Sequence, residues 1–235
     1  METNSTVVYD ISTFNMPEIP QGIILIDKPL GITSFDVVRS LRKELKVKKI
    51  GHAGTLDPLA SGLMILGVEA GTKLLHAYQM LPKIYESEIC VGERTTTSDK
   101  EGKVLESCVV DELDTTIVKK ELHEMQGVLR LPVSIYSAMK KGGEEFYKKA
   151  RRGEHPVPPV RDMEVFEANL VEVCEKRDER MYLRVTFSVG SGTYIRSLAE
   201  ELGRRLGYPA RLENLRRVQV GDFRVEQARE LNVES

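Results

Sequence analysis

The sequence predicts an α+β fold in which a mixed, largely antiparallel central sheet is flanked by helices and loops. Apolar and alternating segments typical of strands outnumber the segments with helical periodicity. Most of the predicted strands alternate polar and apolar side chains, as antiparallel strands with one buried face do. The 235 residues are 41% hydrophobic and 30% charged, which is enough apolar material for a sizeable core. This composition excludes collagen-like, disordered and membrane-spanning classes.

The first part of the chain is expected to alternate short strands and helices. Residues 22–27 (GIILID) form an apolar run typical of a buried strand. A helix is expected next, because Thr33 or Ser34 can cap it and the apolar residues that follow recur at helical spacing. After an irregular, glycine-rich loop at 51–62, the predicted elements are a strand at 63–68, a short helix around 72–79 and an alternating strand at 84–91.

The remainder is expected to complete the sheet and to cover it with helices. Two strands, at 165–174 and 181–189, would pair through a charged turn. A glycine follows each of the predicted helices, which lie at 114–126, 144–152 and 194–206. The last elements are a strand at 217–220 and the start of a further helix at 225–231.

The sequence indicates one domain with a polar extension and an insertion. Residues 1–21 contain no Lys or Arg and no long apolar core, so they resemble neither a secretory signal nor a transit peptide. We expect a polar, partly disordered extension there and one domain at 22–235. Within it, the segment at about 132–161 is polar and basic and contains clusters of glycine and proline. A surface insertion is the expected structure of that segment.

The cysteines indicate a reducing compartment. Cys90, Cys108 and Cys174 are odd in number and widely spaced, which argues against a disulfide framework and against a metal or redox pair. We therefore expect reduced thiols in a cytoplasmic protein without a membrane association.

Charge is segregated along the chain, although the net charge is only −2. That total alone does not suggest a polyanionic partner. The segments 28–52, 139–161 and 196–217 nevertheless carry local sums of +5, +4 and +3, whereas 84–125 carries −6. Each basic segment taken alone is best explained as a solvated helix face. If the three converge in the fold, they would form one face that neutralises phosphates and binds less tightly as salt rises.

The segment at 51–62, GHAGTLDPLASG, is the most informative in the chain. Pro58 fixes its own φ and favours an extended Asp57, and the surrounding glycines allow another backbone or a ligand to approach closely. An Asp-Pro pair is also common in turns and caps. The residues alone therefore leave a catalytic and a structural role for Asp57 equally open, and they favour an ordinary loop histidine at His52.

This segment resembles the catalytic motif of the TruB family of RNA pseudouridine synthases, which modify the uridine at position 55 in the T-arm of tRNA. Further segments resemble other motifs of that family, in family order: 22–31 (GIILIDKPLG), 83–85 (KIY), 92–102, 136–153, 190–196 (GSGTYIR) and 215–217 (LRR). The resemblance implies the pseudouridine synthase fold, with 22–235 as the catalytic domain. It also implies an isomerase that breaks the N-glycosidic bond of uridine, rotates the base and rejoins it through carbon 5.

The resemblance implies three catalytic residues. Asp57 would be the essential carboxylate, either as a nucleophile or as a general base, and both roles need its ionised form. Arg196 would pair with Asp57; a phosphate contact or a surface position is the alternative for this arginine. Tyr85 would stack on the flipped base, a position equally compatible with an inward-facing strand aromatic. The reaction needs no cofactor and no metal, and the sequence contains no metal-ligand pattern.

The resemblance also implies residues that hold the RNA. His52 and Asp99 would help to turn out and hold the RNA loop, although a solvated aspartate is the simpler explanation for Asp99. Tyr194 would pack beneath the site, and the insertion would order as a lid when the RNA binds. The complete set of expected RNA-binding and substrate-binding residues is His52, Asp99, Tyr194, Lys28, Lys140, Lys148, Arg151 and Arg152.

The expected partner is the T-arm stem-loop of tRNA, bound by a monomer that needs no other protein. Family members commonly carry a PUA domain after the catalytic one, whereas this chain ends at Ser235. It is therefore expected to be either a truncated or a compact member. Two other functions stay open: a guide-RNA-dependent synthase that acts on ribosomal RNA, and a tRNA-binding or chaperone module without catalysis.

Overall fold

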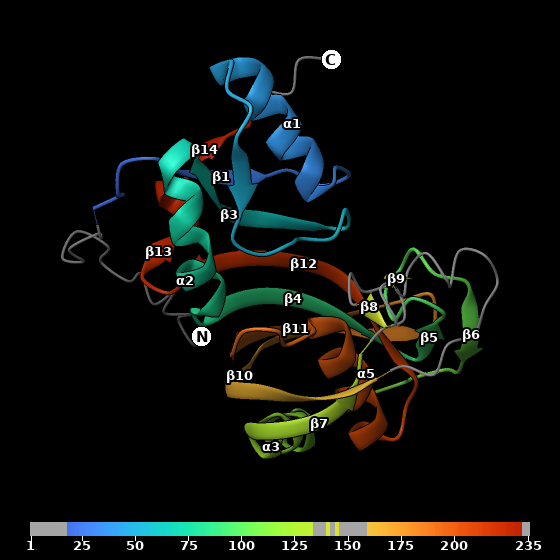
Figure 1. The fold of residues 1–235 in the computed structure, drawn as a ribbon. Coiled ribbons are helices and arrows are strands. Elements are labelled where there is room, and N and C mark those ends of the chain that lie inside the picture. Colours follow the sequence, from blue (N-terminus) through green and yellow to red (C-terminus); the bar gives the residue numbers. More distant parts are fainter. Residues whose placement is uncertain (1–17, 134–139, 142–143, 146–158, 232–235) are drawn as a thin grey trace, which may run out of the picture.

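The centre of the fold is a ten-stranded sheet (Figure 1). We describe it from a computed structural model, which covers residues 18–133, 140–141, 144–145 and 159–231. The strands of this sheet are β1 (Ile23–Lys28), β2 (Ile50–His52), β3 (Ala60–Val68), β4 (Lys83–Val91), β7 (Gly127–Pro132), β10 (Val160–Arg177), β11 (Arg180–Val189), β12 (Ala210–Val220), β13 (Phe223–Arg224) and β14 (Arg229–Glu230).

Antiparallel pairs dominate this sheet. The strand order is β14-β1-β3-β12-β4-β11-β10-β7, with β2 paired to β3 and β13 to β12. Only β1 with β14 and β3 with β12 run parallel among these described pairs. The β3–β12 register places Gly62 opposite Arg217 and thereby brings β12 beside the segment that precedes β3. The predicted fold class, a mixed and largely antiparallel sheet flanked by helices, is confirmed.

Helices and two small sheets surround the central sheet. The α-helices are α1 (Ser34–Leu45), α2 (Leu75–Met80), α3 (Thr115–Glu124) and α5 (Ile195–Leu206), and the 3-10 helices are η2 (Glu69–Leu74) and η3 (Val225–Gln227). The small sheets pair β5 (Glu93–Thr95) with β6 (Val104–Ser107), and β8 (Lys140–Lys141) with β9 (Glu144–Glu145).

Helices α1 and α5 lie on the same face of the sheet. Leu25 and Ile26 are neighbours on β1 but belong to different apolar clusters, so the two clusters lie on opposite faces. The larger cluster contains Ile26 together with Leu41 from α1 and Leu202 from α5. Helix α2 packs against the other cluster. A single sheet face therefore carries the beginnings of both α1 and α5, where the candidate site lies.

Two local predictions are confirmed in detail. Thr33 caps α1, and a capping box joins it to Asp36, in agreement with the predicted start of this helix. Along β4, Tyr85 and Ser87 are buried and Glu86 between them is exposed, as the alternation predicts. Both features depend on neighbouring residues in the chain, which is why the sequence alone reveals them.

Four other segments differ from the predictions. Strands β2 and β3 extend into the predicted loop at 51–62, and β12 begins at Ala210, well before the predicted strand at 217–220. Residues 144–145 lie in β9, where the sequence predicts a helix. Residues 225–231 contain η3 and β14 instead of the start of an α-helix. For β2, β3, β12 and β14 a partner strand distant in sequence supplies backbone hydrogen bonds that local periodicity does not reveal, whereas β9 pairs with the neighbouring β8.

The part of the chain that the structure describes contains neither a helix suited to a membrane nor a cluster of metal ligands. None of its helices combines the length and the apolar character that crossing a bilayer requires. Its His, Cys, Asp and Glu side chains form no group of three or more that is arranged to hold a metal ion.

Candidate active site

The loop that carries Asp57 is tied to the start of α1. The Ser34 hydroxyl accepts a hydrogen bond from the Leu56 N–H (2.8 Å) and donates one to the Leu56 carbonyl (2.9 Å). The N–H of Gly31 donates to the Pro58 carbonyl (2.8 Å). These bonds satisfy backbone groups on both sides of Asp57 and so hold its position relative to the sheet.

Arg196 joins Asp57 to a second carboxylate. Its Nη2 lies 2.9 Å from Asp57 Oδ2, and its Nη1 lies 3.4 Å from Asp99 Oδ2. Nη1 also donates to the Thr97 carbonyl (3.2 Å). The arginine side chain is only 6% exposed, whereas that of Asp57 is 38% exposed. The 97–99 turn thus fixes the guanidinium on its buried side. The carboxylate of Asp57 lies on the other side of the guanidinium and faces the solvent.

A cavity of about 360 Å³ opens around Asp57. This volume lies in the range of small-molecule sites, about 300–1,000 Å³. Asp57 is the one carboxylate among the described lining residues, against four cationic side chains. The excess of positive charge favours an anionic ligand such as a phosphate group. The lining consists of residues 54–57 and 190–196 with Gln79, Lys83, Tyr85, Arg161, Leu215 and Arg217.

Three buried cations surround the site. Lys28 is fully buried and donates to the carbonyls of Pro29 (2.9 Å) and Ile32 (2.8 Å), and burial lowers its pKa to about 8. Burial likewise lowers the pKa of Lys83 to about 8. Arg217 is almost fully buried and donates through Nε to the Leu63 carbonyl (2.7 Å). Carbonyl oxygens therefore satisfy these cations, and no carboxylate among the described residues pairs with any of the three.

Two of the residues expected to contact RNA, Lys28 and Asp99, are buried. Lys28 is directed to backbone carbonyls inside the protein and is not exposed to a ligand. Asp99, predicted as an RNA contact with a solvated position as the alternative, is buried; it accepts hydrogen bonds from Thr97 Oγ1 (2.5 Å) and the Glu101 N–H (3.1 Å). Asp99 lies between β5 and β6, and this hairpin brings it to the site. The guanidinium of Arg196 compensates the buried negative charge of Asp99.

Tyr85, Tyr194 and His52 lie at or beside the cavity. Tyr85 and Tyr194 line it, and both also pack against the larger apolar cluster. His52 ends β2, and its pKa is lowered by burial and by the nearby charge of Arg217. The neutral imidazole is therefore favoured at this position.

The predicted contacts in the insertion cannot be placed. Lys148, Arg151 and Arg152 lie outside the described residues, and Lys140 is described only as part of the backbone of β8. Their contribution to RNA binding stays a prediction.

The basic segment 196–217 does not form a free cationic face. Most of its arginines lie against carboxylates, which compensate their charge. The pairs are Arg204 with Glu201 (2.7 Å), Arg205 with Glu201 (2.8 Å), Arg211 with Glu93 (2.7 Å) and Arg216 with Asp27 (2.6 Å). Of the three segments expected to converge on phosphates, this one is therefore largely compensated by carboxylates. The exposed basic residues of 28–52 are the ones left to bind phosphates.

Sequence reasoning assigned no role to Ser34, Lys83 or Arg217 in the site. Lys83 and Arg217 stand in segments that resemble family motifs, so the motif positions were the available signal. Ser34 was considered only as a helix cap, and its contact with Leu56 depends on a fold in which α1 meets the Asp57 loop.

Comparisons with known proteins show which family this chain is similar to. A model for the TruB family pseudouridylate synthase (N terminal domain) matches residues 42–195. A Mycobacterium tuberculosis protein named tRNA pseudouridine synthase B is 38% identical over 211 residues, which is 90% of this chain and 70% of that protein. A Xylella fastidiosa protein of the same name is 43% identical over 204 residues, which is 87% of this chain and 66% of that protein.

Solved structures share the fold over most of this chain. A chain in a Cbf5-Nop10-Gar1 complex aligns with a TM-score of 0.63 and 27% identity, over 89% of this chain and 52% of that one. A chain in the archaeal box H/ACA sRNP Nop10-Cbf5 complex aligns with a TM-score of 0.62 and 24% identity, over 89% of this chain and 51% of that one. This chain thus spans about half of those solved chains. With the family model matched over most of the described sheet and with relatives at this identity, the chain belongs to the TruB family and is an RNA pseudouridine synthase.

Proposed function

We propose that this chain converts uridine to pseudouridine in tRNA, at position 55 of the T-arm, with Asp57 as the essential carboxylate. The observation that carries the proposal is the Asp57–Arg196 pair at the opening of a cationic cavity. Relatives named tRNA pseudouridine synthase B support tRNA as the substrate.

The reaction rearranges bonds without adding any group. The bond between N1 of uracil and C1′ of the ribose breaks, the base rotates, and a bond forms between C5 and C1′. The C5 proton leaves and N1 gains a proton, so atoms and electrons balance. The ionised Asp57 acts either by attacking covalently or by accepting a proton from the sugar, and both routes agree with its exposed carboxylate.

Neighbouring residues prepare this step. The target uridine leaves the RNA stack and enters the cavity, where Tyr85 stacks on the base. Arg196 holds Asp57 in one orientation, and Tyr194 supports the floor. Arg161, the exposed cation among the described lining residues, attracts a phosphate next to the flipped nucleotide. Residues 22–235 form the catalytic domain in this proposal, and the insertion at about 132–161 grips the RNA.

A tritium-release assay tests the function. Purified chain alone is mixed with a T-arm stem-loop or a full tRNA transcript that carries 5-tritiated uridine, and release of tritium to water is measured. We expect release from both RNAs and none when the uridine at position 55 is replaced by cytidine while the other uridines remain labelled. Release that requires added guide RNA and partner proteins would instead favour the guide-dependent synthase. Tight binding without release would favour the non-catalytic module.

A further inference from the structure

The outer face of α1 combines one exposed aromatic ring with basic side chains. Phe35 and Arg39 are separated by four positions and Arg39 and Arg42 by three, so the three side chains share one face of the helix. Phe35 is 59% exposed and the Arg39 side chain 70% exposed. The Arg42 guanidinium lies 6.0 Å from the centre of the Phe35 ring. We refer to Phe35, Arg39 and Arg42 as the α1 stripe.

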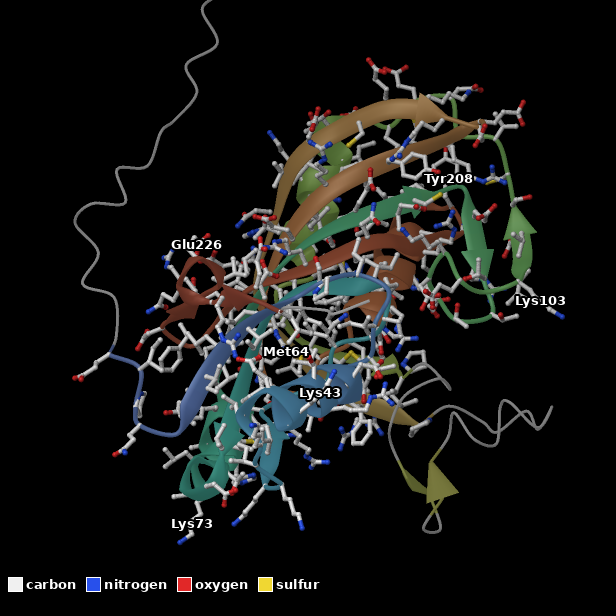
Figure 2. The ribbon with its side chains drawn as sticks, turned by 90° about the horizontal axis from the view of Figure 1, so that it is seen from above. Lys43, Met64, Lys73, Lys103, Tyr208 and Glu226 are labelled. Carbon is white, nitrogen blue, oxygen red and sulfur yellow. The ribbon has the colours of Figure 1, made fainter. Side chains whose placement is uncertain are left out.

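The α1 stripe lies on the flank of α1 that faces the strand leading to the candidate site. Arg42 donates to the Ile50 carbonyl of β2 (3.2 Å), and β2 continues directly into the Asp57 loop. On the other flank, Glu44 pairs with Arg229 of β14 (2.7 Å), at the far edge of the sheet. Figure 2, in which Lys43 is labelled, shows α1 on the outside of the sheet.

The start of the α1 stripe is fixed beside Asp57. Ser34, the residue before Phe35, bonds both backbone groups of Leu56, and Leu56 precedes Asp57 in the loop. The backbone that carries the ring is therefore held by the same contact that positions the Asp57 loop.

The chemistry of the α1 stripe suits an unpaired nucleotide. A base stacks on an aromatic ring whatever its identity, and a guanidinium next to the ring adds attraction to both base and phosphate. Single exposed hydrophobic side chains are common on proteins; here the ring stands within a basic segment that carries a local sum of +5. Asp36, which pairs with Arg39, is the acidic group on this part of the helix and leaves the Arg39 side chain largely exposed.

We propose that the α1 stripe binds an unpaired nucleotide of the substrate RNA next to the flipped uridine: the base stacks on Phe35, and Arg39 and Arg42 meet the adjoining phosphates. This contact rests on the proposed action on tRNA and deepens it, because it adds a second binding position outside the cavity. It holds the RNA in register with Asp57 and takes no part in bond breaking.

Substitutions at two exposed residues of the α1 stripe test the contact, and each has a matched control on α3. Phe35→Ala is compared with Ile117→Ala, which also removes an exposed apolar side chain. Arg39→Gln is compared with Lys119→Gln, which removes one exposed positive charge. The dissociation constant of a T-arm stem-loop is measured by fluorescence anisotropy over a range of salt concentrations. Retention of the circular dichroism spectrum checks the fold.

The two substitutions have different expected signatures. Phe35→Ala should weaken binding by about 5- to 150-fold, the range for loss of one stacked base, without changing the salt dependence. Phe35→Trp should restore binding. A plot of the logarithm of the association constant against the logarithm of the salt concentration has a negative slope. Arg39→Gln should make this slope less steep by about 0.7–0.9, as for loss of one phosphate contact. The rate of tritium release at subsaturating enzyme should fall together with the affinity in Phe35→Ala, because less RNA is bound in register with Asp57.

Further readouts separate the contact from the proposed function. A 2-aminopurine placed at successive loop positions of the stem-loop should be quenched at one position by the wild type and not by Phe35→Ala. If Phe35→Ala and Ile117→Ala bind alike and no position depends on Phe35, the contact is disproved, whether or not tritium is released. If binding depends on Phe35 but the wild type releases no tritium, the contact stands and the proposed function fails. Absence of any RNA binding by the wild type overturns both.

Discussion

Arg196 and Asp57 form an ion pair of 2.9 Å in which the cation is buried and the anion faces the cavity. The same guanidinium also lies 3.4 Å from the buried Asp99. One planar group thus connects two carboxylates that belong to different loops. This geometry fixes the orientation of Asp57 before any substrate binds, which reduces the ordering needed in the reaction.

Replacing Arg196 by lysine tests whether the planar group itself is needed. A lysine keeps the charge, but its single ammonium cannot reach both carboxylates with the geometry of a guanidinium. We expect the single-turnover rate of tritium release to fall by about 10- to 150-fold, as for loss of a charged hydrogen bond. The affinity for the stem-loop should change by less than about threefold. A variant with normal turnover but weakened binding would show that Arg196 acts as a phosphate contact instead.

Gly62 is expected to be intolerant of a side chain because β12 passes directly over it. An added Cβ would lie 2.2 Å from the Arg217 carbonyl oxygen, and the residue has a φ of +107°. Gly62→Ala should therefore destabilise the fold by more than the roughly 1 kcal/mol typical of a positive-φ glycine. Gly127 is a matched control, since its φ is +104° and no atom lies within 4 Å of an added Cβ. If urea unfolding shows that Gly62→Ala and Gly127→Ala lose the same free energy of unfolding, the close approach of β3 and β12 is contradicted.

Lys83 should make stability depend on pH. Its pKa is about 8 in the folded protein, against an ordinary value of 10.5. Below pH 8 the folded state carries the full cost of burying the charge, and this cost disappears as the pH rises from 8 to 10.5. Between these pH values, wild type should therefore gain unfolding free energy relative to Lys83→Met. Lys28, whose pKa is also about 8, is present in both proteins and cancels from the difference. The unfolding free energies of the wild type and Lys83→Met are measured in urea at each pH. If the two change in parallel with pH, Lys83 is not buried in its charged form.

Features set by neighbouring residues could be predicted from the sequence. The capping of α1 at Thr33 and the alternation around Tyr85 need only local spacing, and both are present in the structure. The positions of Asp57 and Arg196 followed from resemblance to family motifs. Their ion pair depends on the sheet topology that brings the start of α5 next to the loop before β3.

Features that depend on distant contacts could not be predicted. Asp99 lies in an acidic stretch of the sequence, where an aspartate is expected to be solvated. The fold instead buries Asp99 against Arg196. Lys28 was expected among the RNA-binding residues, and the fold buries it completely, with its ammonium bonded to carbonyls of the following residues. The arginine-rich segment at 196–217 was expected to contribute to a cationic face, and carboxylates distant in sequence, Glu93 and Asp27, pair with its Arg211 and Arg216. In each case the burial of the group or the partner it meets is set by tertiary structure.

The most direct test of the central claim is single-turnover tritium release from a T-arm stem-loop by the wild type and by Asp57→Asn. Asparagine has nearly the same size and keeps a hydrogen bond to Arg196, so RNA affinity and fold should be retained. The account predicts release by the wild type and a decrease of at least about 10²- to 10⁴-fold in the variant, because the ionised carboxylate takes part in the reaction. Release by Asp57→Asn at the rate of the wild type would contradict it.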